Sequence, residues 1–147
     1  MTVSVRLRRV GNVAIEAPSY QTPGSAGFDL CAAIAEPISL LPGMRCLIPS
    51  GFAMAIPPGY EGQVRPRSGL ALKHGLTIVN APGTIDSDYR GEVAIVLINH
   101  GQEPYVVKPF TRIAQLVISR VERSSFELVD ELDDTLRGQG GYGSTGE

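Results

Sequence analysis

The sequence predicts an all-β fold, either a sandwich or a barrel. Three observations support this prediction. Short apolar runs recur along the whole chain, and Pro-Gly, Gly and Asn-His-Gly turn signals separate them. Seventeen glycines and eleven prolines among 147 residues leave little room for long helices. Many short strands at regular spacing are typical of a sandwich or a barrel.

The expected elements follow from hydrophobic periodicity, beginning at the N-terminus. Val3, Val5 and Leu7 alternate with polar neighbours, which predicts a first strand. One helix is expected over residues 68–74, with Ser68 as its cap. Further strands are expected over 28–35, 46–48, 52–56, 76–79, 93–99, 105–107 and 113–121.

Composition limits the class of protein. A net charge of −2 argues against a nucleic-acid partner, because such proteins usually carry a basic footprint. No run reaches the roughly eighteen apolar residues that span a membrane, so no membrane partner is expected. Cys31 and Cys46 are too few for a disulfide framework or a zinc site, which favours a reduced, cytoplasmic location. The apolar pattern stops near Leu132, which predicts one core over residues 1–131 and an arm over 132–147.

The last eleven residues, RGQGGYGSTGE, have two interpretations. Five glycines in this run disfavour a stable helix or strand, so a disordered tail is the simpler one. The run also suits a nucleotide, because glycine allows backbone amides to approach phosphate oxygens. Arg137 could fork onto a phosphate, and the Tyr142 ring could stack on a base.

Four further polar clusters fall in turns between the expected strands. Asp29 lies at the start of an apolar strand. It is either a turn or edge residue, or an acid that faces metal-bound water. The helical turn begins with Arg67, Ser68 and Gly69. These residues form either an ordinary cap with a solvated arginine or a binding site for an anion.

Of the remaining two clusters, one precedes the strand expected over 93–99 and the other lies at the start of the last strand. Residues 80–92 are expected to form a hairpin, in which Asp86 and Asp88 are turn formers or one of them is a general base. Arg112 and Gln115 stand at the head of the last strand. His74 and His100 are isolated in loops and are interpreted as surface residues.

Together the five clusters resemble the homotrimeric deoxyuridine triphosphatases, or dUTPases. AGFDLCAA, RPRSGLA, GTIDSDYRGE, RIAQL and RGQGGYGSTG follow the order and spacing of the family's five motifs, from about Ala26 to Gly146. One departure is Tyr142, where the family more often has phenylalanine, so an aromatic face is kept.

The resemblance implies a β jelly roll, or distorted β-barrel, that assembles as a homotrimer with three shared active sites. The C-terminal arm would close over a neighbouring subunit's site. The implied reaction is Mg²⁺-dependent hydrolysis of dUTP to dUMP and pyrophosphate, by water attack at the α-phosphorus. This activity limits uracil incorporation into DNA and supplies dUMP for dTMP synthesis.

The resemblance also implies a role for individual residues. Asp86 would be the base that activates water, Tyr89 would pack on the deoxyribose, and Asp29 would accept hydrogen bonds from waters on the magnesium ion. Uracil would be read by Asn80, Gly83, Thr84 and Ile85. The phosphates would be bound by Arg67, Ser68, Gly69 and Gln115, and the arm would supply Arg137, Tyr142, Gly143, Ser144 and Thr145.

Residues near these positions have supporting roles. Arg112 would orient neighbouring acids, and four charged residues are interpreted as structural, possible members of inter-subunit ion pairs: Arg65, Asp88, Arg90 and Glu92. Two alternatives remain open. A dCTP deaminase-like enzyme shares the fold, but it typically carries glutamate where this chain has Asp86. A dUTP-binding regulatory protein on the same scaffold is the other.

Overall fold

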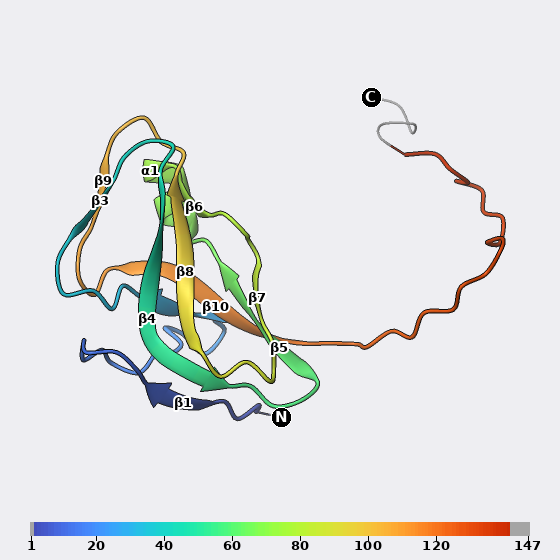
Figure 1. Cartoon of the computed structure of the whole chain (residues 1–147), viewed down its shortest axis with the longest axis horizontal. Coiled ribbons are helices and arrows are strands. Elements are labelled where there is room, and N and C mark those ends of the chain that lie inside the picture. Colours follow the sequence, from blue (N-terminus) through green and yellow to red (C-terminus); the bar gives the residue numbers. More distant parts are fainter. Residues whose placement is uncertain (1, 142–147) are drawn as a thin grey trace.

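The computed structural model describes residues 2–141, and these form ten strands and one short helix (Figure 1). The all-β prediction is therefore confirmed. In chain order the elements are β1 (Arg6–Arg9), β2 (Gly27–Cys31), β3 (Ile38–Leu40), β4 (Arg45–Ala55), β5 (Tyr60–Arg65), α1 (Ser68–His74), β6 (Leu76–Ile78), β7 (Gly83–Ile85), β8 (Glu92–Asn99), β9 (Tyr105–Val107) and β10 (Arg112–Arg120).

The strands form two four-stranded sheets and one two-stranded sheet. The first sheet has the order β1-β4-β8-β6, the second β2-β10-β5-β7, and β3 pairs with β9. Every pairing is antiparallel. Because strands that are distant in sequence are neighbours in both sheets, the second sheet brings the ends of β2, β5 and β10 together.

The core lies between the inner faces of the two larger sheets. In β8, Val93, Ile95 and Leu97 are buried and alternate with half-buried residues, as a period of two requires. Leu30 and Leu116 of the second sheet belong to the same buried cluster. Each such aliphatic side chain contributes about 1.5–3 kcal/mol when it is fully buried.

Strand β4 is longer than the sequence indicated. The two runs expected at 46–48 and 52–56 belong to one strand, whose register shifts between Pro49 and Ala53. Gly51, with φ of 77°, lies within this irregularity, and a Cβ there would stand 2.7 Å from Ile15. Glu92 supports the distortion by accepting a 2.8 Å hydrogen bond from the Gly51 amide. Glycine at this position continues the strand rather than ending it.

Helix α1 spans the expected residues, but its start is not the expected one. Arg67 is the N-cap residue, with extended backbone angles, and no side chain caps the helix. The prediction that Ser68 is the cap is therefore wrong, because Ser68 is already the first helical residue. Gly75 ends the helix at φ of 66°, where a Cβ would collide with Gly101.

The hairpin expected over residues 80–92 is also wrong. Strand β7 pairs with β5 in the second sheet, whereas β8 pairs with β4 and β6 in the first. Residues 86–91 therefore form a turn that crosses between the two sheets. Strands β3, β5 and β7 have no strong apolar signal in the sequence. Strand β5, for example, buries only Gly62 and Val64.

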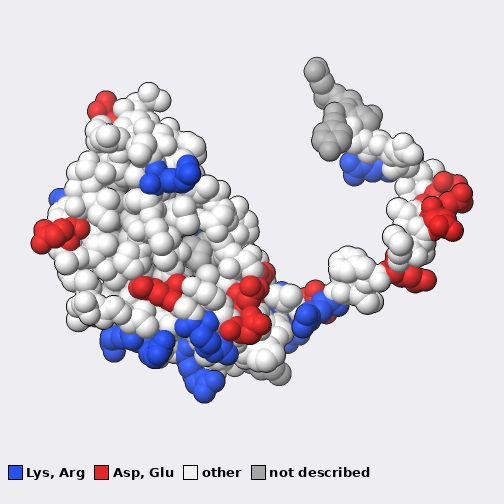
Figure 2. All heavy atoms as spheres, in the orientation of Figure 1, with Lys and Arg blue, Asp and Glu red and all other residues white. Residues whose placement is uncertain are grey.

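The chain leaves the core after β10. We call residues 121–141 the C-terminal extension. Residues 121–139 are exposed, and Figure 1 shows the extension running away from the sheets. Phe126, Leu128 and Leu136 are 97%, 101% and 111% exposed. Figure 2 shows acidic side chains along the extension and basic ones gathered at the edge of the core near β1. Among residues 2–141, no helix has the length and apolarity to cross a membrane.

Candidate active site

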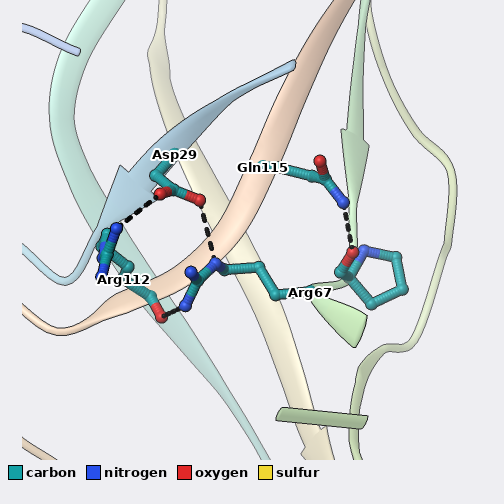
Figure 3. Close-up of polar contacts among 5 residues, drawn as sticks. Asp29, Arg67, Arg112 and Gln115 are labelled. Carbon is teal, nitrogen blue, oxygen red and sulfur yellow. Dashed lines mark hydrogen bonds and ion pairs between the residues drawn. The ribbon is translucent and has the colours of Figure 1, made fainter. Parts of the chain in front are cut away.

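Asp29 is at the centre of a group of ion pairs on the second sheet. It lies on β2 opposite Gln115 of β10, while its neighbours Phe28 and Leu30 point into the core. Its Oδ1 is 2.9 Å from Nε of Arg67, and its Oδ2 is 3.3 Å from Nη1 of Arg112 (Figure 3). The Asp29 side chain is 16% exposed.

Arg67 is held at a second point. Its Nη1 donates a 3.0 Å hydrogen bond to the backbone carbonyl of Arg112 (Figure 3). The arginine therefore lies between the strand that precedes α1 and the start of β10. Its side chain is 29% exposed, so one part of the guanidinium still faces solvent.

Gln115 fixes the segment that leads to Arg67. Its Nε2 donates a 2.9 Å hydrogen bond to the carbonyl of Pro66, as Figure 3 shows. This contact was not expected from the sequence, which indicated only a polar residue near phosphate. The other atom of this side-chain amide, Oε1 of Gln115, lies close to Gly27. A Cβ at Gly27 would stand 3.1 Å from it.

These side chains surround a first hollow, which we call the phosphate hollow after the ligand that the sequence motifs predict for it. It has a volume of about 240 Å³. Its lining residues are Gln21, Ser25, Gly27, Asp29, Arg67, Ser68, Gly69 and Gln115. Thus five residues singled out in the sequence converge here: Asp29, Arg67, Ser68, Gly69 and Gln115.

Sequence reasoning missed the other side of this hollow. Gln21 and Ser25 belong to a turn in which the Ser25 amide donates to the Thr22 carbonyl at 3.1 Å. The Pro-Gly-Ser run just before residue 26 was the available signal, since such runs mark turns.

An adjoining hollow of about 440 Å³ shares Asp29 and Gln21 with the phosphate hollow. Cys31, Phe110 and Arg112 line it. Burial raises the pKa of the Cys31 thiol, and the nearby Asp29 carboxylate raises it further. Arg112 and Arg67 oppose this shift in pKa. Cys31 is therefore a poorly ionised thiol rather than a nucleophile.

Asp86 lies in a different hollow, which we call the turn hollow. It is exposed at the end of β7, where its carbonyl accepts a 3.1 Å hydrogen bond from the Tyr89 amide. Within residues 2–141 its carboxylate has neither a hydrogen bond nor an ion pair. The turn hollow has a volume of about 460 Å³ and is lined by Leu47, Thr84, Ile85, Asp86, Tyr89, Glu92 and Ala94.

Tyr89 is held in a defined orientation at the edge of the turn hollow. Its hydroxyl donates a 3.1 Å hydrogen bond to the Glu92 carbonyl. A Cβ at Gly91 would collide with the same hydroxyl, so glycine allows the ring to lie over the turn. The ring remains 42% exposed and can contact a ligand.

Asn80 and Gly83 lie close together before β7. A Cβ at Gly83 would stand 3.2 Å from Nδ2 of Asn80 and 3.3 Å from Val64. Asn80 is exposed, so its amide is available to a ligand. A side chain at residue 83 would therefore require its neighbours to shift by a few tenths of an ångström.

The structure separates the predicted site into three groups. The phosphate hollow and the turn hollow have no lining residue in common. Arg137 lies on the extension, where its Nε donates a 2.8 Å hydrogen bond to the Gly140 carbonyl. The predictions for Tyr142, Gly143, Ser144 and Thr145 lie outside the described residues.

Three of the four residues interpreted as structural make side-chain contacts within the chain. Arg65 donates to Gln63, Arg90 donates to the carbonyls of Ser87 and Tyr89, and Glu92 accepts from Gly51. His74 and His100 are exposed, as predicted. Within residues 2–141 no group of three His, Cys, Asp or Glu side chains is placed to hold a metal ion.

Comparison with known proteins gives the family. The dUTPase family model matches residues 14–146. A deoxyuridine 5'-triphosphate nucleotidohydrolase from Anaeromyxobacter sp. (strain Fw109-5) is 59% identical over 148 residues, covering 99% of both chains. The protein of the same name from Syntrophotalea carbinolica is 54% identical and covers 99% of this chain and 98% of its own.

Solved structures agree. A mutant of the dUTPase from staphylococcal phage 80alpha is 27% identical with a TM-score of 0.86, covering 98% of this chain and 99% of its own. The 80alpha dUTPase with the analogue dUpNHpp is 26% identical with a TM-score of 0.84, covering 99% and 100%. The predicted jelly-roll fold of the dUTPase type is thereby confirmed, and the chain belongs to the dUTPase family.

Proposed function

We propose that the protein hydrolyses dUTP to dUMP and pyrophosphate, with Mg²⁺ bound to the substrate. The observation that carries this proposal is the phosphate hollow, where Arg67, Ser68 and Gln115 converge beside one carboxylate. Guanidinium, hydroxyl and amide groups are donors that suit phosphate oxygens. The protein's similarity to named deoxyuridine triphosphate nucleotidohydrolases supports the same substrate.

Asp86 is the proposed general base. Water attacks the α-phosphorus, the bond from that phosphorus to the α,β-bridging oxygen breaks, and pyrophosphate leaves. Asp86 takes the proton of the attacking water. Its exposed carboxylate, without a partner among residues 2–141, supports this role, because a paired carboxylate is a weaker base.

Asn80 and the backbone of residues 83–85 are proposed to read the uracil edge. The close approach of Asn80 to Gly83 supports a narrow slot, which would exclude the 5-methyl group of thymine. Tyr89 is proposed to pack on the deoxyribose and exclude a 2′-hydroxyl. Cytosine would leave polar groups of such a slot without hydrogen-bond partners. The discrimination between uracil and cytosine should therefore be large.

The phosphates are assigned to Arg67, Ser68, Gly69 and Gln115. Gly69 supports this assignment because a Cβ there would meet nothing within 4 Å, so the backbone is open to a ligand. The C-terminal arm, residues 132–147, is proposed to complete the site: Arg137, Gly143, Ser144 and Thr145 on the γ-phosphate and Tyr142 over the base.

Magnesium fits this donor set when it arrives with the triphosphate. Mg²⁺ keeps several waters and binds through phosphates with one or two carboxylates nearby, and Asp29 lines the phosphate hollow. Its chemistry would be to neutralise charge on the phosphates. A phage phi11 dUTPase mutant, 25% identical with a TM-score of 0.78, is described with a structural Mg(II) ion, and it covers 87% of this chain and 97% of its own.

The active form is proposed to be a homotrimer with shared sites. The separation of the phosphate hollow from the turn hollow within one chain supports this, because neither hollow alone holds both phosphate ligands and a base. The exposed Phe126, Leu128 and Leu136 support burial of the extension on a neighbouring copy. Free Cys31 and Cys46 favour the cytoplasm.

Pyrophosphate release from dUTP, dTTP, dCTP and UTP, with Mg²⁺ and with EDTA, tests the proposed function. The expected result is Mg²⁺-dependent release from dUTP alone. Ammonia release from dCTP would instead establish a deaminase, and dUTP binding without turnover would establish a regulatory protein. Either outcome overturns the proposal.

A further inference from the structure

Both oxygens of the Asp29 carboxylate are engaged by arginines. Arg67 Nε contacts one at 2.9 Å and Arg112 Nη1 contacts the other at 3.3 Å. Arg67 also donates to the Arg112 carbonyl, so the three residues form a closed triangle of contacts (Figure 3). The hollow thus contains an anion from the chain itself that neutralises its arginines.

This arrangement conflicts with phosphate binding through the same donors. In the proposed function, Arg67 binds the triphosphate, which brings negative charge into a hollow of about 240 Å³ that Asp29 also lines. A carboxylate and a phosphate that compete for one guanidinium repel each other when both are ionised. Because Nε of Arg67 carries a single hydrogen, a phosphate that binds this edge of the guanidinium must displace Asp29 from it.

We propose that Asp29 is a placeholder for phosphate: it holds Arg67 in position while the site is empty, and the arriving triphosphate takes Arg67 from it. This inference rests on the proposed function, and it identifies Asp29 as a positioning residue for Arg67. Phosphate has more acceptor oxygens than a carboxylate and carries more charge, so it wins the exchange.

The exchange has a consequence for the metal. Once Arg67 has moved, the Asp29 oxygen that faced it has lost a charge-assisted partner in a side chain only 16% exposed. Waters on a magnesium ion carried by the triphosphate are donors that can replace it. Asp29 therefore opposes binding of the metal-free nucleotide and favours binding of its magnesium complex.

The test is affinity for the nucleotide analogue dUpNHpp, measured with Mg²⁺ and in EDTA. The wild-type protein should bind much more tightly with Mg²⁺. Asp29→Asn should bind roughly 3- to 10-fold more tightly than wild type in EDTA, the scale of a partly exposed ion pair, and should lose most of the Mg²⁺ enhancement. A purely structural role would weaken binding under both conditions.

Asp88→Asn is the matched control, because it removes one exposed carboxylate that lies outside the phosphate hollow. It should leave the ratio of the two affinities unchanged. Asp29→Ser is a second variant, and thermal unfolding shows whether each variant is folded.

Equal or weaker binding of folded Asp29→Asn and Asp29→Ser in EDTA overturns the inference. Inorganic triphosphate as a second probe should show the same reversal, since the exchange needs no uracil. Wild-type hydrolysis of dUTP, measured in parallel, distinguishes failure of this inference from failure of the proposed function.

Discussion

The phosphate hollow and the turn hollow differ in how their charged groups are held. In the phosphate hollow, Asp29, Arg67 and Gln115 each have a defined partner at 2.9 Å. In the turn hollow, Asp86 is exposed and its carboxylate has no partner within residues 2–141. One group of residues is held by contacts within the chain, and the other presents the carboxylate that the proposed function uses as its base.

In the proposed function, this difference assigns binding to one hollow and proton transfer to the other. Binding groups gain from being fixed in advance, because less ordering remains to be done when the ligand arrives. A general base gains from having no competing partner, because its carboxylate must accept a proton. In the proposed function these two hollows, which have no common lining residue, meet across chains.

Replacing the base should have the largest effect on this division of roles. Asp86→Asn should hydrolyse dUTP roughly 10²–10⁴-fold more slowly, the usual contribution of a positioned base. Because the phosphate hollow is untouched, dUpNHpp affinity should stay near the wild-type value. Near-normal turnover in the variant would remove Asp86 from the mechanism.

Deleting residues 137–147 tests whether the two hollows suffice without the arm. The last strand ends at Arg120, so the core should keep its thermal stability. Turnover should fall by roughly 10- to 100-fold or more, since base stacking alone contributes about 1–3 kcal/mol. Tyr142→Phe should be nearly neutral and Tyr142→Ala clearly impaired.

Wild-type turnover by this truncated chain would reduce the arm to a tail without a catalytic role. Loss of folding would instead identify it as a structural strap. Thermal unfolding and dUTP turnover, measured on all three variants, distinguish these outcomes.

Tyr89→Ala examines the turn hollow alone and should have a smaller effect. Removing the ring opens space beside the sugar, so the ratio of kcat/KM for UTP to that for dUTP should rise roughly tenfold. Exclusion of dCTP should persist, because Asn80 and Gly83 are unchanged. An unchanged sugar ratio would mean that Tyr89 does not select the sugar.

The smallest expected effect concerns the reactivity of Cys31, which lines the hollow that adjoins the phosphate hollow. Because burial and Asp29 raise the pKa of Cys31, its thiolate fraction at pH 8 is below that of an ordinary thiol. Alkylation should therefore be slow at pH 8 and faster as pH rises. Asp29→Asn should accelerate it modestly, whereas Cys46, whose pKa is raised by burial, should not respond to that change. Mass spectrometry of iodoacetamide-treated protein measures both rates, and equal acceleration of both would contradict the assignment.

Much of the fold could be predicted because apolar runs and turn residues mark most strands. Helix α1 was located to the residue, since Gly75 marks its end and Lys73 and His74 suit its last turn. The strands that were missed, such as β5 and β7, are short or glycine-containing and depend on neighbours for their pairing. Pairing with a distant strand leaves no local signal.

The candidate site was less predictable than the fold. Motif resemblance singled out Arg67, Asp86 and Gln115, but not their separation into two hollows, which depends on β7 joining the second sheet. The Asp29–Arg67 contact joins residues far apart in sequence and was not expected. The Gly51 distortion of β4 was likewise invisible, because glycine is usually a sign of a turn.

Mixed oligomers test the shared site most directly. Asp86→Asn and Arg67→Gln are co-expressed with different tags, and oligomers that carry both tags are isolated. Each variant alone should be nearly inactive. In a ring of three chains, about one site in three should then combine an intact Asp86 with an intact Arg67 from a neighbour, and about that fraction of wild-type activity should return. Mixed oligomers no more active than the two parents would mean that each chain holds its own complete site, and would contradict the account.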